Sequence, residues 1–151
     1  MKKDLGGLEE DITGVTCIYI LVKDVYESIK WYQKNLGCAP TSHNPVSPGM
    51  QRSILRFPDQ NGTIPGPGLR QTTPAIFLVT DKTREERVDH TDESKNLHPL
   101  ACFITPRIQE MYIRFIENGV EIVEEMSDDR SVGDHFKFYD LDRNLLEIWQ
   151  P

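Results

Sequence analysis

One order of sequence patterns occurs twice in this chain, and it restricts the fold more than any other feature. In each half, a short β-branched and aromatic run is followed by an amphipathic stripe that ends at a glycine, and then by further strand-like runs. Gly119 follows Gly37 by 82 residues, and Leu100 follows Cys17 by 83, so the two halves superpose with almost no offset. This duplication predicts an α+β fold built from two βαβββ modules.

The first copy begins with residues 15–22, VTCIYILV, a nearly continuous apolar run that is typical of a strand buried on both faces. Asp24 is a favourable helix N-cap, and Gly37 can end the helix in a left-handed conformation. Residues 51–58 and 73–80 are strand-like, and the stretch between them is a long loop rich in glycine and proline. One apolar stripe at helical spacing lies between the two caps: Val25, Ile29, Tyr32 and Leu36.

The second copy repeats this order. Residues 100–105 are strand-like, and a second amphipathic stripe ends at Gly119. Three more strands are predicted in VEIVEEM, HFKFYD and NLLEIWQ, and turn residues 140–144 join the last two. The stripe consists of Ile108, Met111, Tyr112 and Phe115.

These patterns divide the chain into four parts that form one structural domain. Residues 1–13 are polar and aperiodic, which predicts a loose arm, and residues 14–80 form the first module. Residues 81–97 are expected to be a linker, because residues 81–96 contain many charges and a single aliphatic side chain, Val88. The second module occupies residues 98–151, and neither module is expected to be stable alone.

Composition excludes several functional classes. Seventeen basic and 24 acidic residues give a net charge of −7, which repels nucleic acid and anionic lipid. No apolar stretch approaches the roughly 20 residues that span a bilayer, and no secretory signal is recognisable, so we expect a cytoplasmic protein. The three cysteines are far apart and odd in number, which indicates reduced thiols.

A duplicated module of this kind can fold as two curved sheets that face each other across a cavity, each with a helix on its outer side. Side chains on a strand alternate between the two faces of the sheet, so every second residue can point into that cavity. The candidate walls are three sets that each share one face: Cys17, Tyr19 and Leu21; His98, Leu100 and Cys102; Leu145, Glu147 and Trp149.

Two segments resemble a known superfamily. The opening CIYILVKDVYESIKWYQKNLG is similar to the first module of the vicinal oxygen chelate superfamily, and the closing FKFYDLDRNLLEIWQ is similar to its last hairpin. The superfamily includes glyoxalase I, bleomycin-resistance proteins, fosfomycin-resistance enzymes and extradiol dioxygenases. The resemblance implies paired βαβββ modules around a U-shaped cleft whose floor holds a divalent metal, and subunits that often pair.

The resemblance also implies four metal-ligand positions, which this chain fills unevenly. Cys17 stands where a histidine is usual, and Phe77, which has no lone pair to donate, stands where a glutamate is expected. The third position falls on Leu100, with His98 two residues earlier on the same strand face. Glu147 matches the fourth position and could be a metal ligand or a general base.

These residues lead to three functional hypotheses. The preferred one is a protein that binds a small organic ligand in the inter-module cleft, without a metal, against Cys17, Tyr19, Phe77, Leu100 and Trp149 together with Glu147. The second is a lyase, isomerase or extradiol-type dioxygenase that holds one divalent ion, Zn, Ni, Mn or Fe, through Glu147 and His98. The third is a non-catalytic module whose role is to form a homodimer.

Overall fold

The computed structural model describes residues 11–12, 14–41, 45–59, 61–64, 73–81, 98–127 and 133–151. The expected N-terminal arm lies outside the described residues except for Asp11 and Ile12, and the expected linker lies outside them except for Asp81. None of the helices in the described ranges has the length and apolar character needed to cross a membrane.

The chain forms two four-stranded sheets with the same internal order, β1-β4-β3-β2 and β5-β8-β7-β6. In each sheet the outer pair, β1 with β4 and β5 with β8, is parallel, and the remaining pairs are antiparallel. The elements are β1 Cys17–Val22, α1 Val25–Leu36, β2 Ala39–Pro40, β3 Arg52–Arg56, β4 Ala75–Thr80, β5 Cys102–Ile104, α3 Ile108–Glu117, β6 Ile122–Ser127, β7 Asp134–Tyr139 and β8 Leu145–Gln150. The α+β class and the two-module architecture predicted from the repeat are therefore confirmed.

Helix α1 begins and ends where its sequence predicts. The Asp24 side chain accepts a hydrogen bond from the backbone N–H of Glu27 at 3.1 Å, and Gly37 ends the helix with φ 76°. Strand β2 has only two residues and was not anticipated, because Ala39 and Pro40 carry no strand pattern and depend on pairing with β3. Cys17, Cys38 and Cys102 are all free, as expected.

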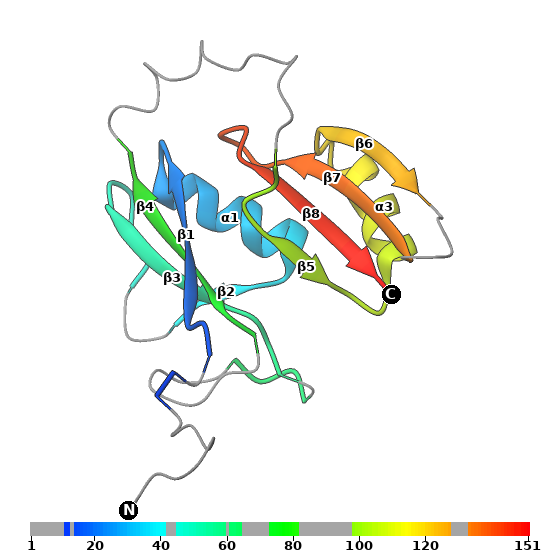
Figure 1. Ribbon diagram of the computed structural model, residues 1–151. Coiled ribbons are helices and arrows are strands. Elements are labelled where there is room, and N and C mark those ends of the chain that lie inside the picture. Colours follow the sequence, from blue (N-terminus) through cyan, green and yellow to red (C-terminus); the bar gives the residue numbers. More distant parts are fainter. Residues whose placement is uncertain are drawn as a thin grey trace, which may run out of the picture.

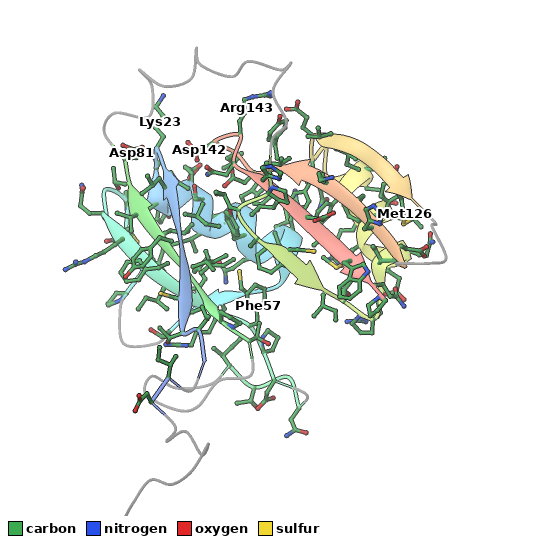
Figure 2. All side chains as sticks on the ribbon, in the orientation of Figure 1. Lys23, Phe57, Asp81, Met126, Asp142 and Arg143 are labelled. Atoms are coloured by element: carbon green, nitrogen blue, oxygen red, sulfur yellow. The ribbon has the colours of Figure 1, made fainter. Side chains whose placement is uncertain are left out.

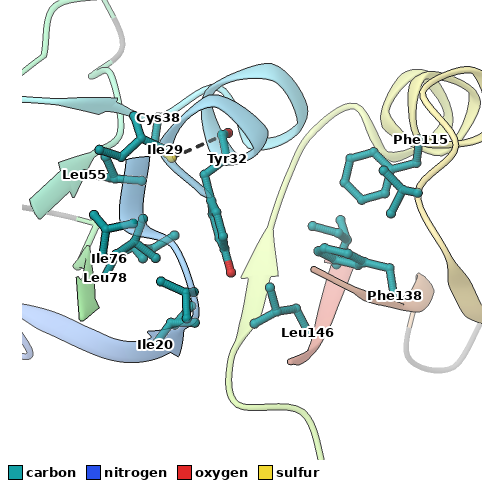
Figure 3. Close-up of a cluster of buried hydrophobic side chains, with 14 of the residues drawn as sticks. Ile20, Ile29, Tyr32, Cys38, Leu55, Ile76, Leu78, Phe115, Phe138 and Leu146 are labelled. Atoms are coloured by element: carbon teal, nitrogen blue, oxygen red, sulfur yellow. Dashed lines mark hydrogen bonds between the residues drawn. The ribbon is translucent and has the colours of Figure 1, made fainter. Parts of the chain in front are cut away.

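The two sheets stand side by side in Figure 1, and each has one face covered by a helix. Alternation along β1 and β4 turns Ile20, Ile76 and Leu78 toward α1, and all three are fully buried. Phe136 and Phe138 of β7 pack in the same way against Phe115 of α3, with ring centroids 5.5 and 4.8 Å apart. Both modules contribute to one core cluster, and Tyr32 stands between their two halves (Figure 3).

A buried polar network joins the modules. The Tyr32 hydroxyl donates to Asp140 Oδ2 at 2.6 Å, and Asn144 Nδ2 donates both to the same carboxylate at 2.9 Å and to the Leu21 carbonyl at 3.0 Å. Asp140 Oδ1 in turn accepts the backbone N–H of Asn144 at 2.8 Å, which fixes the β7–β8 turn. The turn before β8 is therefore part of the inter-module contact as well as of its own hairpin.

Candidate functional site

Each sheet has a second face, turned away from its helix, where the predicted site residues lie. We call these the first and second open faces. By alternation and register, the first contains Cys17, Tyr19 and Leu21 of β1, Arg52, Ile54 and Arg56 of β3, and Ala75, Phe77 and Val79 of β4. The second contains Cys102 and Ile104 of β5, His135, Lys137 and Tyr139 of β7, and Leu145, Glu147 and Trp149 of β8.

The first open face has an apolar centre. Tyr19 and Ile54 flank Phe77 in register, and the Tyr19 and Phe77 rings stack with centroids 5.1 Å apart. Tyr19 is nevertheless 65% exposed, so this face is not covered by the other sheet of the same chain. Arg56, at the end of β3, is 8% exposed and its Nε and Nη1 have no hydrogen-bond partner. A buried guanidinium of this kind is a group that an acceptor on a ligand would satisfy.

The second open face has a polar centre. Cys102 and Lys137 flank Glu147 in register, on β5 and β7 respectively. Partial burial of the thiol, followed by the negative charge of Glu147 and a hydrogen bond to it, raises the pKa of Cys102 to about 11. The positive charge of Lys137 lowers the pKa of Cys102 and so opposes this rise, which means that it also acts on the thiol. A thiol, a carboxylate and an ammonium group thus lie side by side between aromatic and aliphatic neighbours.

The predicted site residues fall into separate groups. Tyr19 and Phe77 are brought together on the first open face with Cys17 nearby, whereas Glu147 and Trp149 lie on the second. Leu100, 54% exposed, precedes β5, and its backbone N–H donates to the Leu145 carbonyl at 2.8 Å. Within one chain, therefore, the sheets do not face each other across a closed hollow, and the six predicted ligand-binding residues stay predictions.

The strand pairing does not place the two predicted metal ligands side by side. Glu147 pairs with Cys102, whereas His98 lies four residues before Cys102 and outside β5, so the pair stays a prediction. Phe77 again offers no donor atom at its position on β4. Among the described residues, no group of three or more His, Cys, Asp or Glu side chains could hold a metal ion. The described residues of one chain therefore do not supply a donor set that fits a divalent cation.

A cleft does lie between the modules, and of the wall residues predicted from the sequence only Cys102 lines it. We call it the seam groove. It has a volume of about 620 Å³, and Phe57 and Phe103 approach across it with ring centroids 5.8 Å apart. Figure 2 shows Phe57 at this junction of the two sheets. The groove is lined by Lys34, Leu36, Gly37, Phe57, Pro58, Thr73, Pro74, Cys102, Phe103, Ile104, Thr105, Pro106, Arg107, Glu110, Met111 and Arg114.

The walls of the seam groove come from several elements and the residues beside them rather than from one strand face. They include the last turn of α1, the residues after β3 and before β4, all of β5, and Glu110, Met111 and Arg114 of α3. Alternation finds residues that share a face of one sheet, but it carries no information on which element ends meet across a module boundary. The sequence signal that could have indicated this site is the presence of prolines and cations near the ends of these elements, such as Pro58, Pro106 and Arg107.

A sequence model of the "Glyoxalase/Bleomycin resistance protein/Dioxygenase superfamily" matches residues 14–148 of the chain. Among curated proteins, none matches this chain.

Similar solved structures share the fold at low sequence identity. A mutant of the fosfomycin resistance protein FosX from Listeria monocytogenes, complexed with Mn(II) and 1S,2S-dihydroxypropylphosphonic acid, is 18% identical and has a TM-score of 0.61, covering 92% of this chain and 90% of its own. A superfamily member from Sphaerobacter thermophilus is 20% identical with a TM-score of 0.61, covering 93% and 98%. TioX from a Micromonospora species is 14% identical with a TM-score of 0.60, covering 91% and 98%.

Proposed function

Because this chain belongs to the glyoxalase/bleomycin resistance protein/dioxygenase superfamily, we propose that it binds a small organic ligand against its open faces. The ligand is held between the first open face of one copy and the second open face of another, in a homodimer. An apolar, aromatic wall opposite a wall with a few polar groups is the usual composition of a small-molecule site. Arg56, Glu147 and Lys137 supply those polar groups.

The three free cysteines support a cytoplasmic location.

One observation carries this proposal, namely the exposure of large apolar side chains on both open faces. Tyr19 is 65% exposed on the first face, Ile104 is 67% exposed on the second, and Leu100, which precedes β5, is 54% exposed. Contiguous apolar surface on a folded protein marks a site of interaction, since water contact with it is unfavourable. A second copy offers the complementary face without requiring another partner.

Sedimentation of the purified protein tests the homodimer. Tyr19→Glu and Ile104→Glu each place a charge on an open face and should convert a dimer into a monomer. Ile113→Glu is the matched control, because Ile113 is 55% exposed but lies on α3. If the wild-type protein stays monomeric up to millimolar concentration, the proposed homodimer is wrong.

A thermal-shift screen of hydrophobic antibiotics, thiol adducts and aromatic metabolites tests ligand binding. A hit should raise the melting temperature of the wild type by several degrees at saturating concentration and raise that of Phe77→Ala much less. If dimers form but no compound produces a shift, the non-catalytic homodimerisation module is the better description.

The similar FosX structure is complexed with Mn(II), which supports one further candidate, a metal-dependent lyase, isomerase or dioxygenase that uses Glu147 and His98. In this candidate the two residues come from two copies of the homodimer, because the strand pairing of one chain places Cys102 and Lys137, not His98, beside Glu147. Elemental analysis of the purified protein decides this point. Stoichiometric metal that disappears in both Glu147→Ala and His98→Ala would replace the metal-free proposal. Metal that survives either substitution would exclude this pair as its ligands.

A further inference from the structure

The seam groove differs from the open faces in both its position and its chemistry. Its volume of about 620 Å³ lies within the range of roughly 300–1,000 Å³ that accommodates small organic ligands. Its apolar wall includes Phe57, Phe103 and Met111, which come from both modules. An aromatic or aliphatic body of moderate size therefore has a complementary surface here.

The charge of this groove is opposite to that of the whole protein. The chain carries a net charge of −7, yet among the described residues the groove is lined by three cations, Lys34, Arg107 and Arg114, and by one acid, Glu110. Glu110 lies 3.7 Å from Arg107, and both side chains are largely exposed, so this pair neutralises only part of the positive charge. A ligand that enters the groove therefore meets a locally positive wall.

Arg114 is already fixed in position by the contact between the modules. Its Nη2 donates to the Asn35 carbonyl of α1 at 3.0 Å, and its buried Nε has no hydrogen-bond partner. Asn118, one turn further along α3, donates to Asn35 Oδ1 at 2.9 Å and holds the same junction. The guanidinium is thus oriented before a ligand arrives, which lowers the entropic cost of binding an anion beside it.

We propose that the seam groove binds an organic anion with an aromatic or bulky apolar body. The apolar body packs against Phe57, Phe103 and Met111, and the carboxylate, sulfonate or phosphate group meets the cationic wall formed by Lys34, Arg107 and Arg114. The groove shares Cys102 and Ile104 with the second open face, but its cations Lys34, Arg107 and Arg114 lie outside both open faces, so substitutions at Lys34 and at Tyr19 distinguish this site from the one proposed above.

Two dyes with the same ring system test the requirement for an anion. The anionic probe is 8-anilinonaphthalene-1-sulfonate, and the neutral probe is N-phenyl-1-naphthylamine, which lacks the sulfonate. Fluorescence titration of the wild-type protein should give one saturable site per chain for the anionic dye, with at least tenfold weaker binding of the neutral dye. Added salt should weaken the binding of the anionic dye only.

Variants locate the dye. Lys34→Glu should lower the affinity for the anionic dye roughly tenfold. Lys30→Glu makes the same charge change one turn earlier on α1, outside the groove, and should leave the affinity within about twofold. Met111→Trp should block both dyes by filling the groove, and Thr73→Trp does so from the opposite wall if Met111→Trp fails to fold.

Three results would overturn this site. Equal affinity for the two dyes removes the anion requirement. An equal loss of affinity in Lys30→Glu and Lys34→Glu shows a response to overall charge alone. Undiminished binding in a folded groove-filling variant, or a loss of binding in Tyr19→Ala, places the dye on the open faces instead.

Discussion

The two open faces occupy equivalent places in the duplicated fold and have opposite chemistry. The third residue of β4 is Phe77, and the third residue of β8 is Glu147. Phe77 is flanked by Tyr19 and Ile54, whereas Glu147 is flanked by Cys102 and Lys137. The backbone register is the same in both sheets, so the difference lies entirely in the side chains. The two modules therefore share one backbone arrangement, but the central side chains are apolar on the first open face and ionisable on the second.

The largest effects should come from the cores behind the two faces. Ile76 and Leu146 are the second residues of β4 and β8, and both are fully buried. Ile76→Ala and Leu146→Ala should each lower the free energy of unfolding by about 2–5 kcal/mol, because each leaves a cavity. Urea titration followed at Trp31 and at Trp149, one tryptophan in each module, measures both.

The two tryptophan signals should report one transition in both core variants. Leu141→Ala is the control, since Leu141 is 55% exposed and its truncation should change stability by no more than about 0.5 kcal/mol. If the first module unfolds while Trp149 keeps its native signal, the two modules have independent cores and do not share one core cluster.

The second-largest effect should come from the contact that joins the modules. Tyr32→Phe removes the hydroxyl that donates to Asp140 and should destabilise the protein by about 1–3 kcal/mol. Burial, followed by the Asp140 charge, raises the pKa of Tyr32 well above its usual 10.0. The unfolded state therefore loses this proton first, so wild-type stability falls as the pH rises above about 10.

The difference in unfolding free energy between the wild type and Tyr32→Phe isolates the contribution of the Tyr32 hydroxyl proton. Urea titrations at several pH values should show the wild type losing about 1.4 kcal/mol more per pH unit than Tyr32→Phe above pH 10. Parallel pH dependences for the two proteins would mean that the Tyr32 hydroxyl ionises equally well in the folded state.

A smaller effect is expected on the reactivity of Cys102, which lies beside Glu147 on the second open face. In a Cys17→Ser background, iodoacetamide should modify Cys102 slowly at pH 8 and faster as the pH approaches about 11, the value to which its pKa is raised. Cys38 is 1% exposed with a pKa raised to about 12, so it should not interfere. Glu147→Gln should move the reaction profile toward pH 9.0, because it removes a negative charge beside the thiol.

Phe77→Leu, at the equivalent position of the first module, is the matched control for Glu147→Gln. It should leave the Cys102 profile unchanged. A profile that shifts equally in both variants would mean that the open faces are in contact within one chain and are not chemically separate.

The smallest effect is expected at the β7–β8 turn. Arg143 has φ 60°, a left-handed conformation that costs a residue other than glycine on the order of 1 kcal/mol. Its guanidinium, however, donates to Glu121 at 2.9 Å and lies 4.3 Å from the Tyr139 ring centroid. Arg143→Gly should therefore change the unfolding free energy by less than about 1 kcal/mol in urea titration, whereas Arg143→Ala, which keeps the strain and loses the contacts, should be less stable than Arg143→Gly.

The sequence predicted the elements well because their signals are local. The stripe from Val25 to Leu36 and its caps at Asp24 and Gly37 depend on residues within a few positions of one another. Alternation likewise placed Tyr19 and Glu147 on strand faces predicted to line a cavity, and both lie on the open faces. Strand β2 was missed because Ala39 and Pro40 become a strand only through β3. The seam groove was missed because Lys34, Phe57 and Arg114 meet through packing between modules, which no periodicity encodes.

The hydrogen bonds from Tyr32 and Asn144 have a consequence for how the polypeptide can be divided. Asp140 takes its partners from α1 and from its own hairpin, and Asn144 reaches the carbonyl of Leu21. A fragment that ends before the second repeat would expose Tyr32 to water and leave its hydroxyl without Asp140. The two pieces, made separately, should be poorly folded alone and should regain structure when mixed, as in fragment complementation.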